Sequence, residues 1–543
     1  MSPLLIGRPV DHYDLGDGTI GVLTSNGQVF QLEPDELFLL QNLQQFTPSK
    51  DIPTFLERRG WQNEDPNYTE ELVAGLLQKG LLLTQDQLKG RLIELGEETP
   101  HQEQKSISII NWVTCDRPDL LERGMKSFIE NCKQYGHEPL YRVCDDSKSL
   151  EMRKKNRSVV DKLAQEYRID TSYLGYEEKL GLIESLLNQP QNQFTKVELR
   201  FLLFGVLPGQ EPLTLSEMTA GANANAAYLA AGDNAVLMID DDLVCETWLA
   251  EPTDNSIQLC LDNSGEDFWF YPSYEEMAPL VQPTRIDILK AFNEHLDSPA
   301  KLHELLRENL DWNNLSAPLV EFLWTRKPQV ALCCAGSHGD SGLGSNVHFR
   351  HWGEGAKKKF FPDEKTFQTA MTSRIMRRCP TTLSVCRDSS FQTMCYSLVP
   401  SRSFLLFPAT RAADDIFWLS SLINNKDLVK IRLPFSLGHY ASTNPLYQEH
   451  RPKIMDTLTH ILLRSKHERL LVSPDSASIY QDFLFRTQIM VGKVVSVDEN
   501  STENNFPSYH EVSSSLPVAQ EKVELFRSIL LKTKSSYTMV NTP

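Results

Sequence analysis

The sequence predicts an α/β protein whose largest part is a mostly parallel β-sheet with helices between its strands. Apolar runs at 106–113, 139–143 and 235–239 are typical of buried strands, and each is followed by a loop that carries aspartates. After the first run, the spacing of Leu121 and Met125 favours an amphipathic helix. Alternating strands and helices form parallel sheets, which bind ligands at the carboxyl ends of their strands.

The first 88 residues predict a small unit of mixed α and β structure. Apolar runs at 18–23 and 29–32 flank Ser25-Asn26-Gly27, which is typical of a β-hairpin turn. The elements expected after the hairpin are three short helices and a closing strand, at 33–43, 49–56, 68–79 and 81–83. This order of elements indicates a winged helix.

The charge of this first unit argues against DNA as its partner. Residues 1–88 contain five Lys and Arg against thirteen Asp and Glu, a net charge of −8. Such a surface repels phosphates. A peptide that adds a strand to the hairpin edge is the better expectation. The alternative is that the unit only packs against the rest of the chain.

The composition of the whole chain excludes several classes of protein. Its 543 residues carry 54 Lys and Arg against 72 Asp and Glu, a net charge of −18, which argues against nucleic acid and anionic membranes as partners. We expect no membrane span and no signal peptide. Ten scattered cysteines without a CxxC pair fit reduced thiols, and therefore a cytoplasmic protein.

The order of domains follows from changes in composition. A polar, acidic stretch predicts a linker at 89–105, and the large domain is expected over 106–443. The remainder, 444–543, is expected to be a helical accessory region that includes a helix at about 518–532. The sequence makes no prediction of the oligomeric state.

Three consecutive aspartates follow the strand at 235–239. Side chains alternate along an extended chain, so Asp240 and Asp242 are expected to point the same way. Two carboxylates that close repel each other unless a cation lies between them, and Mg²⁺ or Mn²⁺ prefers such oxygen ligands. The alternative is a solvated acidic turn.

These motifs resemble those of a family-2-type glycosyltransferase with the GT-A fold, a Rossmann-like catalytic domain. The resemblance covers about 140 residues from Ile107 to Glu246, and it rests on four segments, namely Thr114–Pro118, Asp145–Ser147, Gly221–Asn225 and Asp240–Asp242. It implies a UDP-sugar donor whose diphosphate is held by Mn²⁺ or Mg²⁺. The nucleotide-sugar contacts that it implies are Thr114, Asp116, Arg117, Asp145, Asp146, Gly221, Asn225 and Asp241. The chain departs from the family at Asn223 or Ala224, where an arginine that contacts the diphosphate is expected.

The same resemblance implies roles for residues later in the chain. Asp414-Asp415 resembles the acidic pair in which the second acid is the general base, with the first orienting it. The alternative is a pair of acids that stabilises a helix N-terminus. His439 is placed to join Asp240 and Asp242 as a metal ligand, although a structural histidine is the alternative.

The first unit resembles the PqqD-like recognition element that binds leader peptides during the biosynthesis of ribosomal peptide natural products. The two resemblances together imply an inverting glycosyltransferase that modifies a precursor peptide while holding its leader. One alternative is an enzyme that acts on a polysaccharide or a small-molecule acceptor. Another is a non-catalytic protein that binds peptides or sugar nucleotides.

Overall fold

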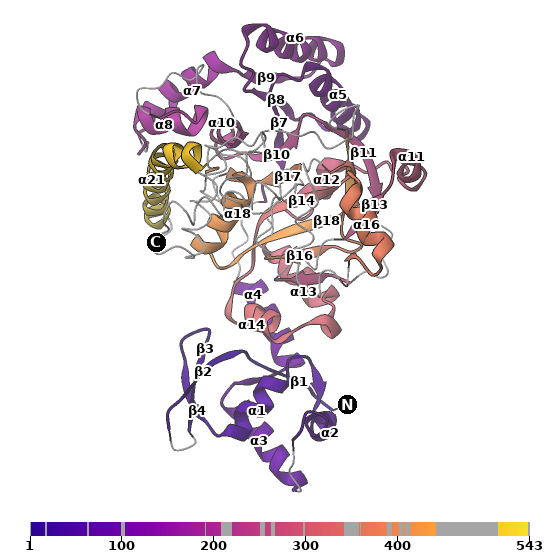
Figure 1. The fold of residues 1–543 in the computed structure, drawn as a ribbon, viewed down its shortest axis with the longest axis vertical. Helices are drawn as coiled ribbons and strands as arrows, with labels where there is room; N and C mark the ends of the chain where they lie inside the picture. The colour runs from indigo at the N-terminus through magenta and orange to yellow at the C-terminus, as the bar shows by residue number, and fades with distance from the viewer. Residues whose placement is uncertain are drawn as a thin grey trace.

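A computed structural model shows a small N-terminal unit joined through one helix to a larger α/β body (Figure 1). The structure describes residues 2–16, 19–61, 65–98, 104–190, 192–207, 220–249, 256–261, 267–296, 299–341, 358, 360–387, 394–400, 406–407, 413–440 and 509–540. Within these ranges no helix has the length and hydropathy that crossing a membrane requires.

The N-terminal unit contains the hairpin, the three helices and the closing strand that the sequence predicts. Its strands are β1 (Leu4–Gly7), β2 (Val10–Asp14), β3 (Ile20–Thr24), β4 (Val29–Leu32), β5 (Thr47–Pro48) and β6 (Leu82–Thr84). Its helices are α1 (Pro34–Asn42), η1 (Ser49–Asp51), α2 (Ile52–Glu57) and α3 (Pro66–Gln78). The sequence analysis missed β1 and β2. Strand β1 lies in the middle of one small sheet, β5-β1-β6, and β2 lies at the edge of another, β2-β3-β4. Strand β2 has an exposed, polar surface, so its composition carries no strand signal.

The predicted linker at 89–105 is wrong over 89–98, where the chain continues helix α4 (Gln85–Glu98). Leu88, Leu92 and Leu95 are buried in the core of the large body. They repeat at four and three residues, which places them on one face of a helix. The acidic residues that suggested a linker lie on the other face, so α4 connects the units as a packed helix (Figure 1).

A buried ion pair also joins the N-terminal unit to the large body. Arg8 donates to both carboxylate oxygens of Glu321, from Nε at 2.7 Å and from Nη2 at 2.9 Å. Arg8 also donates to the carbonyl of Gly80, and the Ser25 hydroxyl donates to Glu321. Both charged side chains are more than 90% buried. The hairpin turn is thereby held against helix α14 (Ala317–Thr325).

The large body is built on a sheet of twelve described strands. The main path runs β12-β16-β18-β14-β17-β10-β7-β8-β9, and β11, β13 and β15 pair at its side. The strands are β7 (Ile107–Thr114), β8 (Leu140–Asp145), β9 (Thr171–Leu174), β10 (Ala235–Asp240), β11 (Leu243–Leu249), β12 (Gln258–Cys260), β13 (Phe268–Tyr271), β14 (Gln329–Asp340), β15 (Ile375–Arg378), β16 (Ser384–Cys386), β17 (Cys395–Leu398) and β18 (Leu428–His439). Neighbours from β10 to β9 are all parallel, as predicted, and the remaining pairs are of both kinds. The α/β class is therefore confirmed.

Helices cover both faces of this sheet. On one face α5 (Pro118–Tyr135) and α6 (Leu150–Tyr167) pack against Trp112 and Tyr141. The helices of the other face are α7 (Tyr176–Leu187), α8 (Lys196–Phe204), α10 (Ala220–Ala231), α18 (Ala413–Asn424) and α21 (Tyr509–Val540). The remaining helices are α11 (Tyr274–Met277), η3 (Ala278–Leu280), α12 (Ile288–Asn293), α13 (Pro299–Asn309), η4 (Trp312–Asn314) and α16 (Glu364–Thr372).

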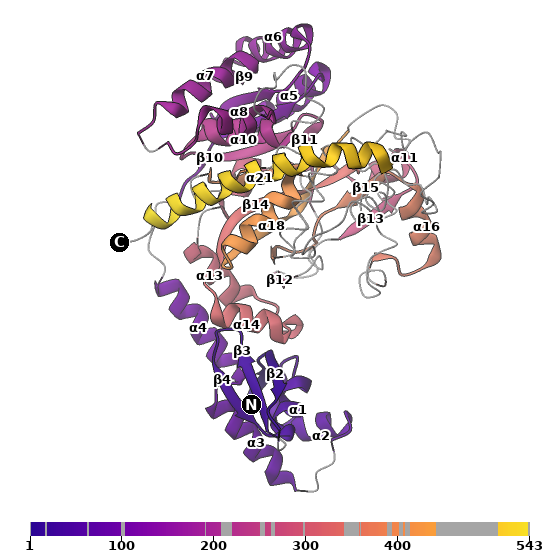
Figure 2. The ribbon, with the colours of Figure 1, turned by 60° about the vertical axis from the view of Figure 1, so that its left-hand side comes forward.

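The C-terminal helix α21 is longer than the expected 518–532. It begins at Tyr509 and contains Pro517, a residue that usually marks a helix start. One apolar face, with Val512, Val523 and Phe526, packs into the same core as α8 and α10. Figure 2 shows α21 lying across the large body. The C-terminal helix therefore packs with the body, whereas the rest of the accessory region, 444–508 and 541–543, lies outside the described residues.

Two buried histidines, His303 and His338, and the half-buried His295 predict that the fold loses stability in acid. Burial lowers the pKa of His295 to about 4 and of His338 to about 3, and it also lowers the pKa of His303. The unfolded chain protonates each imidazole near pH 6.5, so their contribution is present above that pH and is lost as the pH falls. We expect melting temperatures, measured by circular dichroism, to fall between about pH 6.5 and 5. The His295→Gln variant should show a shallower fall, and an identical slope would contradict the assignment.

Candidate functional site

Strands β7, β8 and β10 bring three acidic loops to one edge of the sheet. Thr114 is aligned with Asp145, and Asp240 with Val113, so the ends of the three strands lie side by side. Asn223 of α10 ties two of these ends, because its Nδ2 donates to the carbonyls of Thr114 and Cys144 at 3.3 and 2.8 Å. The prediction that these loops share one edge is confirmed.

Asp241 is held by the first loop. Its carboxylate accepts from Thr114 Oγ1 at 2.7 Å and from Arg117 Nη1 at 3.1 Å. Burial and the charge of Asp242 raise the pKa of Asp241 to about 6, against the opposing effect of Arg117 and Thr114. Arg117 also contacts Asp242 at 3.1 Å, and its side chain is half-exposed. Thr114 and Arg117 therefore connect the first predicted loop directly to the aspartate triplet.

Asp242 and His439 form a buried pair, with 3.0 Å between Oδ1 and Nε2. The register of β11 on β18 sets Leu243 opposite His439, so the residue before Leu243 meets the histidine. Burial acts to raise the pKa of Asp242, but His439 and Arg117 hold it below its usual value. In turn, burial acts to lower the pKa of His439, and Asp242 raises it to about 9. The pair is therefore an ion pair near neutral pH.

The other nitrogen of His439 determines which way the ring faces. Nδ1 is bonded to the carbonyl of Asp340, so it carries a proton and Nε2 is the nitrogen that faces Asp242. Gly339 allows this approach, since its φ is +108° and a Cβ there would lie 2.4 Å from the His439 carbonyl oxygen. A larger residue at 339 would displace the histidine.

Asp240 lies in a strongly acidic environment at the end of β10. Desolvation and the carboxylates of Asp242 and Asp414 raise the pKa of Asp240 well above its usual value. Asp414 comes from the first turn of α18, so the structure brings that helix start to the triplet. The side chain of Asp415 lies outside the described part of the structure. The location of Asp414 and Asp415 at the start of α18 fits both interpretations of the pair, as catalytic acids and as acids that stabilise a helix N-terminus.

The second acidic loop is held differently from what the resemblance implies. Asp145 accepts from the Ser147 amide at 2.7 Å, from Asn156 Nδ2 at 3.0 Å and from the Tyr173 hydroxyl. Its carboxylate therefore organises the loop. Asp146 forms an ion pair with the fully buried Lys179.

The sequence analysis missed Lys179, which also donates to Asn223 Oδ1 at 2.9 Å. A signal for it exists, because Lys179 occurs in α7 with Tyr176 and Ile183 at the three- and four-residue spacings of one helix face. A lysine on such a face is expected to have a buried partner.

Three more of the implied contact residues lie in surroundings of their own. Asn225 is fully buried, and it exchanges hydrogen bonds with the backbone of Phe407 and donates to the carbonyl of Leu202. Its amide thus fixes α10 in the core. Gly221 is buried in the same helix. Asp116 is exposed, with a strained φ of 59° and its amide bonded to Ser147 Oγ.

Among the described residues, no group of three or more His, Cys, Asp and Glu side chains is arranged to hold a metal ion. The expected trio of Asp240, Asp242 and His439 is therefore not a preformed site, although Asp242 and His439 are adjacent. No protein-family model matches the chain, and no curated protein matches it either.

Proposed function

We propose that the chain is a metal-dependent glycosyltransferase of the GT-A type that transfers a sugar from a UDP-sugar to a ribosomally made precursor peptide. The observation that carries the proposal is the Asp242–His439 pair at the carboxyl edge of β10, with Asp240 and Asp414 beside it. Carboxylates from two distant segments and one oriented imidazole meet where an α/β sheet binds ligands.

Asp242 and His439 fit two ligands of Mn²⁺ or Mg²⁺. With Nδ1 bonded to the carbonyl of Asp340, Nε2 exposes a lone pair toward Asp242 once it loses its proton. A bound cation would supply charge that stabilises the departing diphosphate. The oxygens of that diphosphate would complete the coordination, because the chain provides no third side chain at bonding distance in its described part.

Nucleotide binding is assigned to the loops after β7 and β8. Asp116 and the half-exposed Arg117 belong to the first of these loops, and Arg117 contacts Asp241 and Asp242 at 3.1 Å. Lys179 donates to Asn223 at 2.9 Å, so it is the cation at the position where the family has its diphosphate arginine. Lys179 brings a second positive charge beneath Asp146. We assign to these two cations the positive charge that the family supplies with an arginine near Asn223, where this chain has none.

The acceptor side is assigned to α18. Asp415 would take the proton of an acceptor hydroxyl as that oxygen attacks the anomeric carbon, and Asp414 would orient it. The proximity of Asp414 to Asp240 supports this placement. The acidic N-terminal unit, fixed by Arg8 and Glu321, would hold the leader of the same peptide and raise the local concentration of its acceptor residue.

Calorimetric titration of the full chain with UDP, with and without Mn²⁺, tests the proposal. We expect binding that requires Mn²⁺ and disappears with a chelator. Because the pKa of His439 is raised to about 9, the cation must displace its proton, so affinity should rise with pH up to that value. Titrations in two buffers of different ionisation enthalpy would measure the released proton. Metal-independent UDP binding would refute the metal site, and no binding would favour a non-catalytic peptide-binding protein.

A further inference from the structure

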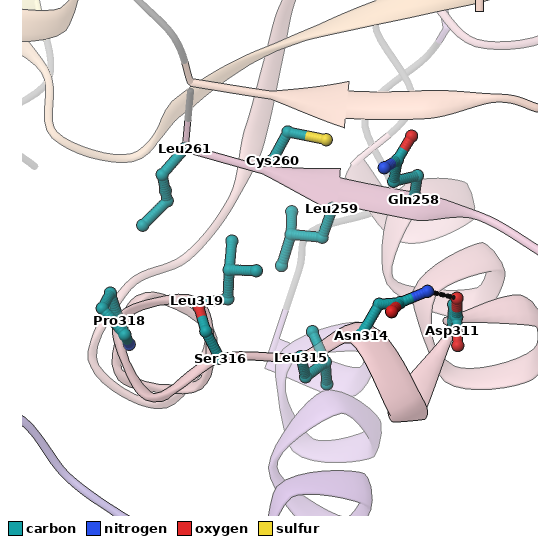
Figure 3. A pocket seen from close by; sticks show the side chains of 10 residues that line it. All are labelled: Gln258, Leu259, Cys260, Leu261, Asp311, Asn314, Leu315, Ser316, Pro318 and Leu319. Carbon is teal, nitrogen blue, oxygen red and sulfur yellow. Dashed lines mark hydrogen bonds between the residues drawn. The ribbon is translucent and has the colours of Figure 1, made fainter. Parts of the chain in front are cut away.

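A cavity of about 340 Å³ lies beside β12 (Figure 3), and its lining includes none of the residues of the acidic edge. Its walls come from β12 on one side and from the η4–α14 segment on the other. The lining residues are Gln258, Leu259, Cys260, Leu261, Asp311, Asn314, Leu315, Ser316, Pro318 and Leu319. The volume is at the lower end of the range for ligand sites, about 300–1,000 Å³.

The cavity follows the outer edge of the main sheet: among the described strands, none pairs with β12 on the side away from β16. Gln258 and Cys260 bond to the β16 side, since the Gln258 amide donates to Leu383 at 3.0 Å and the Cys260 carbonyl accepts from Arg387 at 2.8 Å. Backbone groups alternate in direction along a strand, so the N–H and C=O of Leu259 face the other side. That side is the one where the cavity lies.

A neighbouring segment already pairs with this edge one step earlier. The Ile257 amide donates to the carbonyl of Asn309 at 2.6 Å, and its carbonyl accepts from the Asp311 amide at 3.1 Å. At Asp311 that segment turns into η4, and its carboxylate binds Asn314. The 309–311 segment therefore pairs with this edge only at Ile257. The cavity begins beyond that point, where a longer partner strand would pair with Leu259.

The cavity also adjoins the junction with the N-terminal unit. Ser316, at its rim, forms a β-bridge with Gln45, and the Ala317 amide donates to the carbonyl of Gln44 at 3.0 Å. A peptide held by the N-terminal unit therefore has this cavity next to it. Asp311 is the one charged residue of the lining, and the N-terminal unit is acidic, which favours a neutral or basic peptide.

We propose that this cavity is a strand-addition subsite for an extended, non-acidic peptide, which pairs with Leu259 and places apolar side chains between Leu315 and Leu319. The inference names a second contact for the peptide acceptor, and it rests on the proposed function only for the identity of that peptide. Main-chain hydrogen bonds supply affinity in such sites, and side-chain pockets supply specificity.

The test uses a phage-displayed library of random peptides selected on the full chain, with the selected sequences remade as free labelled peptides. Leu319→Trp fills the cavity, and Asn314→Trp blocks its exposed rim without changing the core. Leu280→Trp is the matched control, because Leu280 is 53% exposed and lies outside the lining. Fluorescence anisotropy measures the affinity of each peptide for each variant.

We expect peptides whose affinity falls at least about tenfold in the two cavity variants and stays unchanged in Leu280→Trp. Alanine scanning of such a peptide should show a two-residue period, and N-methylation of alternate amides should weaken it. The proposal is overturned if no peptide is selected, if the selected peptides bind the cavity variants as well as wild type, or if the period is helical. The UDP and Mn²⁺ titration, repeated on each variant, reports the donor site separately, so the two proposals can fail independently.

Discussion

Replacing Asp242 with alanine is expected to abolish metal-dependent UDP binding and to lower sugar transfer by about 10²–10³-fold. The carboxylate is buried and contacts both His439 and Arg117, so its loss removes a metal ligand, leaves His439 without its carboxylate and leaves Arg117 paired with Asp241 alone. Binding is measured by calorimetry and transfer by the mass increase of the acceptor peptide.

The removal of Asp242 has a second expected consequence, which tests the Asp242–His439 ion pair itself. Burial lowers the pKa of His439 and Asp242 is the main group that raises it, so in Asp242→Ala the pKa should fall below 9, with only the effects of Asp340 left to oppose burial. The imidazole resonances, followed by NMR across pH, would report this shift.

Asp161→Ala serves as the matched control for this experiment. Asp161 is exposed on α6, remote from the triplet in the chain, and its removal should leave UDP binding and melting temperature unchanged. If Asp242→Ala keeps wild-type metal-dependent binding, Asp242 is not a ligand. The proposed mechanism would then have to be abandoned.

Local signals account for much of what the sequence predicts correctly. The hairpin follows from Ser25-Asn26-Gly27, with Gly27 at a φ of 85°, and the three helices follow from their starts and apolar spacing. The strands ending at Thr114 and Asp240 follow from continuous apolar runs. In each case the information lies within a few residues, so local composition and the spacing of apolar residues are sufficient to predict the element.

What the sequence does not predict arises where distant segments decide the outcome. Helix α4 is polar on average, and only its contact with the large body shows why Leu88 and Leu92 are apolar. Asn225 and Asp145 have the residue types of a nucleotide site, yet their hydrogen bonds go mainly to backbone and to Asn156 and Tyr173. The position of His439 depends on the pairing of β18 with β11, across nearly two hundred residues of chain.

Breaking the Arg8–Glu321 pair is expected to destabilise the junction between the two units by about 3–5 kcal/mol. In Glu321→Gln, the buried guanidinium of Arg8 loses its carboxylate and keeps only the Gly80 carbonyl and a neutral amide as acceptors. The cost is therefore mainly that of an uncompensated buried charge. Urea unfolding should show an earlier first transition, which is read separately because a chain of several units need not unfold in one step.

A double-mutant cycle separates the charge from the packing. Arg8→Met combined with Glu321→Leu replaces both charges with apolar side chains, and such replacements are often close to neutral. We therefore expect the double variant to be more stable than Glu321→Gln alone. Lys327→Ala is the control, because Lys327 and Glu98 form an exposed pair at 2.7 Å that also involves the connecting helix, and its loss should cost less than about 1 kcal/mol.

The same variants separate the stability of the junction from its use. If the N-terminal unit delivers a peptide to the large body, Glu321→Gln should weaken transfer to peptides that include a leader and leave transfer to leaderless peptides unchanged. UDP binding should also stay unchanged, because the pair lies at α14 and the donor site at the β10 edge. Equal losses on both kinds of peptide would mean that the junction supports folding only. If Arg8→Met/Glu321→Leu still transfers more sugar to peptides with a leader, the pair serves to position the N-terminal unit on the large body, and its charges are not required.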